Sequence, residues 1–300
     1  MSRAPAGVLA PVVSTFDAET GDLAPVPFRA NIRAHMDAGL AGVVIAGSTG
    51  EAALLGERER ADLVEWARTL VPEDRWLIAG VGGESTRITI DRARQMAERG
   101  ADAVIVVSPH YYTAAMTPEA LATHFRRVAD ASPVPVILYN IPKYTHFALD
   151  PGLVFELATH GNVIGIKDSS GDLKLLGGYL AAQSDRFAVL TGSGASIYAA
   201  LEMGARGGIL AVSLFAAALS MQVYDSWRAG NAAAAGRAQE RLMPLAKTIV
   251  AALGVPGVKA AMDVAGLAGG PPRGPLLPLS RSEREQVEML LRAADLARAA

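Results

Sequence analysis

The sequence predicts an α/β fold, a (β/α)8 TIM barrel with a C-terminal helical appendix, and two observations carry this prediction. Eight short apolar runs alternate with stretches of helical periodicity from about residue 6 to residue 230. Beyond Asn231 the alternation stops and only helical patterns follow. Because eight strand-helix units favour a closed parallel barrel over an open sheet, we expect the barrel at residues 1–230. C-terminal helices packed on the barrel are expected at residues 231–300.

Each predicted strand is a run of four to six mostly apolar residues with turn signals on both sides. This pattern is typical of a strand buried on both faces of a parallel sheet. The eight runs are residues 8–13, 42–46, 76–81, 103–107, 134–139, 163–167, 187–190 and 207–211. Helical periodicity separates them, most clearly at residues 57–70, 86–99 and 118–131.

Helix boundaries carry their own signals. Thr117-Pro118 and Asp150-Pro151 each place a capping side chain before a proline at the first helical position. The predicted C-terminal helices are residues 232–253, 256–265 and 282–298, with a rigid Gly-Gly-Pro-Pro break at residues 269–272. An independent interaction domain is the alternative, but the lack of an obvious linker favours an appendix.

Composition excludes several classes of function. The 300 residues are 51% hydrophobic and 19% charged, and the formal net charge of -2 lacks the basic excess of a nucleic-acid-binding protein. The chain has no cysteines, which excludes disulfides, thiolate zinc sites and cysteine nucleophiles. Residues 1–13 lack the apolar core of a signal peptide, and Glu202 and Arg206 interrupt the apolar stretch at residues 199–219. We therefore expect a cytoplasmic protein with no membrane or nucleic-acid partner.

Lys167 ends the predicted strand at residues 163–167 and is followed by Asp168. A lysine at a buried strand end is costly, because desolvation favours the free amine, which is a nucleophile toward a carbonyl carbon. This is the chemistry of a Schiff-base lysine. The alternative, which is commoner for an isolated lysine, is a side chain that reaches the surface and pairs with Asp168.

The other predicted strands bring polar residues to the same end of the barrel. In such barrels the chemistry lies on the loops that follow the strands, where side chains from several strands converge. The residues that follow the eight runs are Ser14-Thr15, Gly47-Ser48-Thr49-Gly50-Glu51, Gly82-Gly83-Glu84, Ser108-Pro109-His110-Tyr111-Tyr112, Tyr139-Asn140, Lys167-Asp168, Thr191-Gly192-Ser193-Gly194 and Val212-Ser213. This face is rich in hydroxyl groups and glycine and has one lysine.

Two of these segments could bind a small anion and transfer protons. Residues 47–51 present backbone N–H groups and two hydroxyls, a cradle for a carboxylate, although an ordinary glycine turn is the alternative. Tyr139 could shuttle protons through neighbouring hydroxyls, or it could be a core tyrosine whose OH bonds to the backbone. Tyr111 and Tyr112 face the same choice, and one of them could act outside its own subunit.

Metal and triad chemistry are not indicated. The five histidines show no ligand spacing with one another or with carboxylates; they are His35, His110, His124, His146 and His160. A Ser-His-Asp system would need a Gly-x-Ser-x-Gly elbow after a strand, which the sequence lacks. We expect neither a metal nor a cofactor.

Three motifs resemble, in order and spacing, those of the dihydrodipicolinate synthase/N-acetylneuraminate lyase family of class I pyruvate-dependent aldolases. They are Gly47-Ser48-Thr49-Gly50-Glu51, Tyr139-Asn140-Ile141-Pro142 and Gly165-Ile166-Lys167-Asp168-Ser169-Ser170-Gly171. The resemblance covers nearly the whole chain, including the helical tail. It implies a Schiff-base lyase or aldolase on this barrel, assembled as a homotetramer from two tight dimers.

The resemblance also implies residue roles. Lys167 is expected to form the imine and Tyr139 to donate and accept protons, while Ser48 relays protons and Tyr111 is lent by the neighbouring subunit. The expected substrate-binding residues comprise a carboxylate cradle, a backbone contact to pyruvate and the surroundings of the second substrate. They are Thr49, Gly50, Ile209, Tyr144, His146 and Ser193.

Tyr144 departs from the pattern of the synthases. They place an arginine two residues after the proline of the Tyr-Asn-x-Pro motif, where it holds the carboxylate of aspartate semialdehyde, and a phenol does not replace a bidentate guanidinium. The segment at residues 108–112 with Met116, and the tail at residues 254–259 and 269–271, resemble 4-hydroxy-2-oxoglutarate aldolases.

We therefore predict an aldolase that cleaves or forms a carbon-carbon bond between pyruvate and an aldehyde, with a 4-hydroxy-2-keto acid as substrate. The enzymatic alternatives are a 4-hydroxy-tetrahydrodipicolinate synthase and a sugar-acid dehydratase of the same family. The alternative of another class is a keto-acid-binding regulatory barrel without catalysis.

Overall fold

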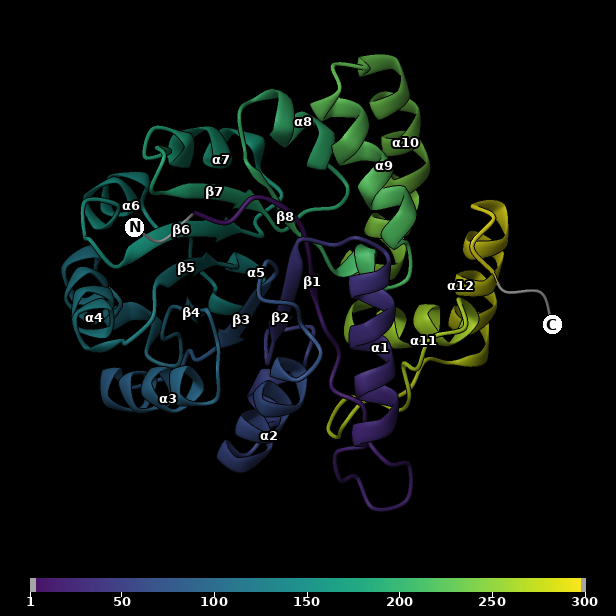
Figure 1. The fold of residues 1–300 in the computed structure, drawn as a ribbon, viewed down its shortest axis with the longest axis horizontal. Helices are drawn as coiled ribbons and strands as arrows, with labels where there is room; N and C mark the ends of the chain where they lie inside the picture. The colour runs from purple at the N-terminus through teal and green to yellow at the C-terminus, as the bar shows by residue number, and fades with distance from the viewer. Residues whose placement is uncertain (1–3, 298–300) are drawn as a thin grey trace.

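Eight parallel strands close into a barrel in the computed structural model, which describes residues 4–297 (Figure 1). The strands neighbour one another in chain order, and the first pairs with the last. They are β1 Gly7–Pro11, β2 Gly42–Ile45, β3 Trp76–Gly80, β4 Ala103–Val107, β5 Val136–Asn140, β6 Val163–Asp168, β7 Ala188–Thr191 and β8 Gly207–Ile209. The predicted (β/α)8 barrel is confirmed.

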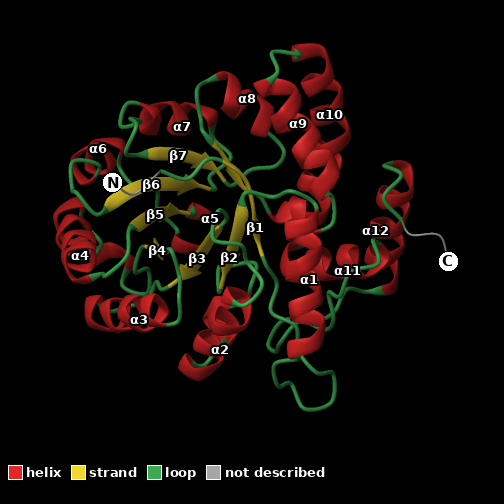
Figure 2. Cartoon of the chain, in the orientation of Figure 1, coloured by secondary structure: helices red, strands yellow, loops and turns green. Residues whose placement is uncertain are grey.

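Helices surround the barrel (Figure 2). The α-helices up to the end of the barrel are α1 Pro25–Asp37, α2 Glu57–Arg68, α3 Thr86–Glu98, α4 Pro118–Ala131, α5 Pro142–Thr145, α6 Pro151–Leu157, α7 Leu173–Leu180, α8 Ile197–Glu202 and α9 Ala217–Arg228. The predicted caps are present. Thr117 Oγ1 accepts a hydrogen bond from the Ala120 amide at 3.2 Å, and the Asp150 carboxylate accepts one from the Leu153 amide at 3.1 Å. These bonds satisfy amides that have no partner within the first helical turn.

Some strand ends differ from the predicted ends where backbone chemistry intervenes. β5 begins at Val136 instead of Val134, because Pro135 has no N–H to donate to a neighbouring strand. β8 ends at Ile209 instead of Ala211, and the chain turns there into the 3-10 helix η3, Ala211–Leu214. Apolar residues continue through both boundaries, so hydrophobicity alone does not mark them.

Two groups of apolar side chains lie on opposite faces of the strands. Successive residues such as Val43 and Val44 belong to different buried clusters, as expected for strands that are covered on both faces. The smaller cluster fills the barrel with aliphatic side chains, among them Leu9, Ile78, Ile105, Ile137, Ile164 and Leu190. The interior of the barrel is thus a packed core.

The C-terminal helices gather on one side of the barrel, where α10 packs on α9 (Figure 1). They are α10 Ala232–Pro244, the π-helix η4 Leu245–Ala252, α11 Gly254–Val264 and α12 Arg281–Ala293. Pro244 lacks the N–H that α-helical bonding requires, and the wider π turns begin at the next residue. The predicted appendix is confirmed as helical, while the proposed domain boundary at residue 230 stays a prediction.

The predicted end of the last helix is wrong. α12 stops at Ala293 instead of Arg298, which lies outside the described residues. Asp295, with a φ of 56°, lies in the left-handed region and cannot continue a right-handed helix. Between residues 4 and 297, none of the helices combines the length and the apolar character that crossing a membrane requires.

Candidate active site

Lys167 lies near the carboxyl end of β6 with only 6% of its surface exposed. Its Nζ lies 4.3 Å from the centre of the Tyr139 ring, and the two residues are paired in the register of β5 and β6. Gly192 leaves room for the lysine, because a Cβ there would lie 3.1 Å from Lys167 Cε and would collide with Ser169. The alternative of a lysine that reaches the surface is therefore wrong.

Asp168 fixes the loop after β6. Its carboxylate accepts hydrogen bonds from the Asn140 side-chain amide at 2.7 Å and from the amide and hydroxyl of Ser170 at 3.0 and 2.8 Å. Burial raises the pKa of Asp168, and the hydrogen bonds from Asn140 and Ser170 oppose that rise. Neutral groups thus satisfy this carboxylate, in contrast to the pairing with Lys167 considered as an alternative.

Tyr139 meets a hydroxyl from another loop. It is 5% exposed, and its OH lies 3.4 Å from Ser48 Oγ, with either atom able to donate the hydrogen bond. A phenol that contacts a second hydroxyl can pass a proton along, whereas one tied to a backbone carbonyl cannot. This contact favours the proton-shuttle interpretation of Tyr139 over that of a core tyrosine.

The loop that carries Ser48 is tightly folded. The Glu51 amide donates a hydrogen bond to the Ser48 carbonyl at 3.2 Å, and the Ser14 hydroxyl donates one to the Gly50 carbonyl at 2.7 Å. Position 50 requires glycine, because a Cβ would lie 2.7 Å from the Val12 carbonyl oxygen. This close packing on the end of β1 holds the loop at the mouth of the barrel.

Glu51 connects this loop to the C-terminal appendix through an ion pair and a hydrogen bond. Its Oε1 lies 2.5 Å from Lys259 Nζ on α11, and the two side chains are 0% and 1% exposed. The contact is a buried ion pair, and Oε2 accepts a hydrogen bond from the Arg273 amide at 2.8 Å. Lys259 also donates to the Pro271 carbonyl at 2.7 Å. These contacts of the appendix therefore stabilise the position of the loop that carries Ser48.

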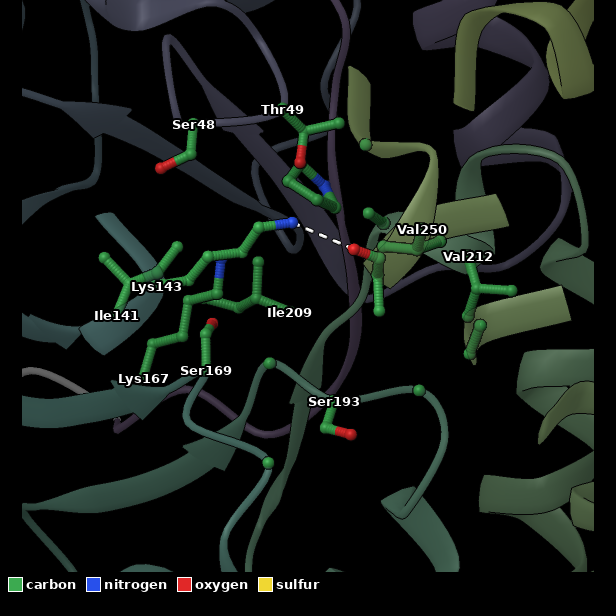
Figure 3. A pocket seen from close by; sticks show the side chains of 18 of the residues that line it. Ser48, Thr49, Ile141, Lys143, Lys167, Ser169, Ser193, Ile209, Val212 and Val250 are labelled. Atoms are coloured by element: carbon green, nitrogen blue, oxygen red, sulfur yellow. Dashed lines mark hydrogen bonds between the residues drawn. The ribbon is translucent and has the colours of Figure 1, made fainter. Parts of the chain in front are cut away.

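A cavity of about 210 Å³ opens at this end of the barrel (Figure 3). Seven of the predicted site residues line it: Ser48, Thr49, Tyr139, Tyr144, Lys167, Ser193 and Ile209. They come from the carboxyl ends of five strands or from the segments that follow those ends, as the barrel fold predicts. The cavity is small enough to enclose a keto acid of a few carbons.

Three predicted site residues do not line this cavity. Gly50 packs beneath the loop, and His146, with a φ of 64°, caps the end of α5 and is exposed. Tyr111 is 77% exposed and stacks edge to face on Tyr112, with ring centres 5.0 Å apart. The Glu84 carboxylate accepts a hydrogen bond from the Tyr111 amide at 2.8 Å, so the loop is held with its aromatic side chains outward.

The structure adds residues that sequence reasoning missed. Lys143, on α5, lines the cavity, and its Nζ donates a hydrogen bond to the Ala251 carbonyl at 2.9 Å (Figure 3). The far wall is apolar and comes from η3, η4 and α11; it includes Val212, Ala246, Val250, Val255 and Val258. The available signals were the place of Lys143 directly after Pro142 and the apolar pattern of the tail. Neither signal says which side chains face the barrel mouth.

The chain has no cysteine, so a metal site would need His, Asp and Glu side chains as ligands. Residues 4–297 contain no group of three or more such ligands that could hold a metal ion. The polar groups that line the cavity are hydroxyls, phenols and two amines. These groups suit proton transfer and covalent catalysis.

Comparison with known proteins identifies the family. Residues 4–294 match the model of the Dihydrodipicolinate synthetase family. The chain belongs to this family. Its members are class I pyruvate-dependent lyases and synthases, and the chain is an enzyme of this class.

Individual members are similar over their whole length. A 4-hydroxy-tetrahydrodipicolinate synthase of Methanopyrus kandleri is 31% identical over 287 residues, which cover 95% of this chain and 94% of the relative. The solved structure of YagE, a prophage protein from E. coli K12 in complex with pyruvate, has a TM-score of 0.91 and 29% identity, covering 97% and 99% of the two chains. A structure described as the first monomeric dihydrodipicolinate synthase variant has a TM-score of 0.91 and 27% identity, and the match covers 97% of each chain.

Proposed function

We propose that the Lys167 amine attacks the ketone carbon of pyruvate, or of a 4-hydroxy-2-keto acid, and forms an imine with loss of water. The observation that carries this proposal is the buried Lys167 amine in the cavity, beside the Tyr139 phenol. The protonated imine draws electrons from the adjacent carbon. Loss of a proton there gives an enamine that attacks an aldehyde, and the reverse sequence cleaves the bond. Hydrolysis of the imine then releases the product and restores the lysine.

Tyr139 is the proposed proton donor and acceptor. Its 3.4 Å contact with Ser48 supports a hydroxyl chain, which Tyr111 of a neighbouring subunit would complete. The exposure of Tyr111 and its place outside its own cavity support this role. The active assembly is then at least a dimer, and the family resemblance supports a homotetramer.

The carboxylate of the keto acid is assigned to the loop after β2. Thr49 and Ser48 line the cavity with their hydroxyls, and the adjoining backbone amides favour an anion. Ile209, at the end of β8, would supply a backbone contact to the keto acid, and Ser193 lies on the loop after β7. This arrangement would hold the keto acid with its ketone toward Lys167.

Two second substrates are candidates. The names of the relatives support condensation of pyruvate with aspartate semialdehyde, the reaction of a 4-hydroxy-tetrahydrodipicolinate synthase. Tyr144, in place of the arginine of the synthases, supports the second candidate, reversible cleavage of 4-hydroxy-2-oxoglutarate to pyruvate and glyoxylate. Both reactions begin with the same imine on Lys167.

Product analysis distinguishes the two reactions. The purified protein is incubated with pyruvate and aspartate semialdehyde, and separately with 4-hydroxy-2-oxoglutarate, and products are followed by mass spectrometry and a coupled pyruvate assay. Consumption of the semialdehyde with a cyclic product supports the synthase, and release of pyruvate with glyoxylate supports the aldolase. Tight binding of pyruvate without turnover of any aldehyde partner or keto acid would favour the non-catalytic barrel instead.

A further inference from the structure

Lys143 occupies a distinctive place at the mouth of the barrel. It lies on the single-turn helix α5, which Pro142 starts directly after β5, so its backbone is fixed close to the strand that carries Tyr139. Its side chain extends across the cavity toward the C-terminal π-helix η4, where Nζ donates to the Ala251 carbonyl at 2.9 Å (Figure 3). Lys143 therefore links α5 to η4 across the mouth of the cavity.

The charge of the cavity is unbalanced. In the described part of the chain, Lys143 and Lys167 are the basic residues that line it, and no aspartate or glutamate does. In the proposed reaction the Lys167 nitrogen is bonded to the keto acid as the imine, and the loop after β2 receives the carboxylate of the keto acid. Lys143 is held by neutral groups, the Ala251 carbonyl and the Tyr144 ring 5.7 Å away. Its positive charge is thus left for a second anionic group.

Lys143 is exposed at the mouth of the cavity, where an entering anion can reach its ammonium group directly. The wall beside it is apolar, formed in part by Val250 and Val255, and it offers the ammonium group no competing anion. A carboxylate that enters makes a charge-assisted hydrogen bond, about twice as strong as a bond to a neutral carbonyl. It can therefore displace the Ala251 carbonyl from the ammonium group.

We propose that Lys143 recognises the distal carboxylate of the second substrate and so restricts the enzyme to aldehydes and keto acids that carry an acidic group. This inference rests on the proposed imine at Lys167 and specifies the substrate class of that site. The cation then comes from position 143, one residue before the position at which the synthases have arginine. Aspartate semialdehyde and glyoxylate both meet the requirement, since each carries a carboxylate.

The test uses pairs of keto acids that differ only at the distal end. 2-Oxoglutarate and 2-oxopentanoate have the same five carbons and end in a carboxylate or a methyl group; 2-oxoadipate and 2-oxohexanoate form the corresponding six-carbon pair. Each acid is incubated with the full-length protein and sodium borohydride, which reduces an imine to a stable secondary amine. Mass spectrometry of the peptide with Lys167 gives the concentration for half-maximal labelling. This readout needs no aldehyde turnover, and labelling by pyruvate reports the imine itself.

Three variants make the test specific. Lys143→Met removes the charge and keeps the length of the side chain, and Lys143→Arg keeps the charge. Lys247→Met removes an exposed lysine from the same π-helix, outside the cavity, and is the matched control. We consider the chain length, five or six carbons, whose diacid labels the wild type at the lower concentration. For that pair, half-maximal labelling of the wild type should need about 10- to 100-fold less diacid than monoacid, the range that one hydrogen bond to a charged group provides. Lys143→Arg and Lys247→Met should retain this preference, and Lys143→Met should reduce it to about 2-fold or less.

The outcomes separate the two levels of the proposal. If the wild type labels with pyruvate but does not prefer either diacid, or if Lys143→Met keeps the preference, the role of Lys143 is refuted and the imine stands. If no keto acid labels Lys167 in the wild type, the proposed function is wrong, and the role of Lys143 falls with it.

Discussion

Replacing Lys259 with methionine should destabilise the fold by about 3–5 kcal/mol, the usual cost of removing one partner from a buried ion pair. The Glu51 and Lys259 side chains are 0% and 1% exposed, and their charged atoms are 2.5 Å apart. At an effective dielectric constant of about 20, Coulomb's law gives an attraction of about 7 kcal/mol at that distance. The cost of desolvating both groups offsets part of this attraction in the wild type. In the variant, the desolvation of Glu51 persists without the attraction.

Urea denaturation followed by circular dichroism measures this change in the free energy of unfolding. Glu51→Gln combined with Lys259→Met removes both charges. The loss of stability in the double variant should therefore be smaller than the sum of the losses in the two single variants by at least about 2 kcal/mol. Lys247→Met, at an exposed site, should change stability by no more than about 0.5 kcal/mol. A loss below about 1 kcal/mol for Lys259→Met, or strict additivity, would refute this account of the pair.

Three further predictions concern proton transfer, assembly and pH. Tyr139→Phe should lower kcat by about 10²–10⁴-fold while the imine still forms at Lys167, and an unchanged kcat in steady-state assays would contradict its role. Mixing the inactive variants Lys167→Ala and Tyr111→Phe should restore activity through hybrid dimers, and no recovery despite proven subunit exchange would exclude a shared site. Burial lowers the pKa of His35 and His124 from 6.5 to about 4. Between pH 6.5 and pH 4 these histidines bind protons in the unfolded chain but not in the folded protein. The free energy of unfolding therefore falls as the pH decreases toward 4. Urea denaturation should show a loss of about 2 kcal/mol per histidine between pH 7 and pH 5, and equal stability at both values would contradict the burial of neutral imidazoles.

Much of the fold follows from local patterns in the sequence. The alternation of apolar runs with helical stretches predicted every strand of the barrel, and polar caps such as Thr117 predicted helix starts. The predicted ends of strands and helices are wrong where apolar residues continue across a change of backbone geometry. Pro135 delays the start of β5, and Pro244 is followed by a π-helix inside a stretch that otherwise has an ordinary helical pattern.

The centre of the site was predictable because the fold brings strand ends together. Lys167, Tyr139 and Ser48 follow their strands directly, so a correct strand assignment places them on one face. The contributions of the appendix were not predictable in the same way. The pair of Glu51 with Lys259 and the bond from Lys143 to the π-helix depend on how the C-terminal helices dock on the barrel, which no local pattern encodes.

Borohydride trapping with pyruvate tests the central claim most directly. Reduction of a pyruvate imine should add one stable adduct to the protein, and peptide mass spectrometry should locate it at Lys167 alone. Lys167→Ala should take up no adduct, whereas Lys143→Arg, which keeps the neighbouring charge, should be labelled at Lys167. An unmodified Lys167 in the wild type, or equal labelling of other lysines, would contradict the proposed imine mechanism.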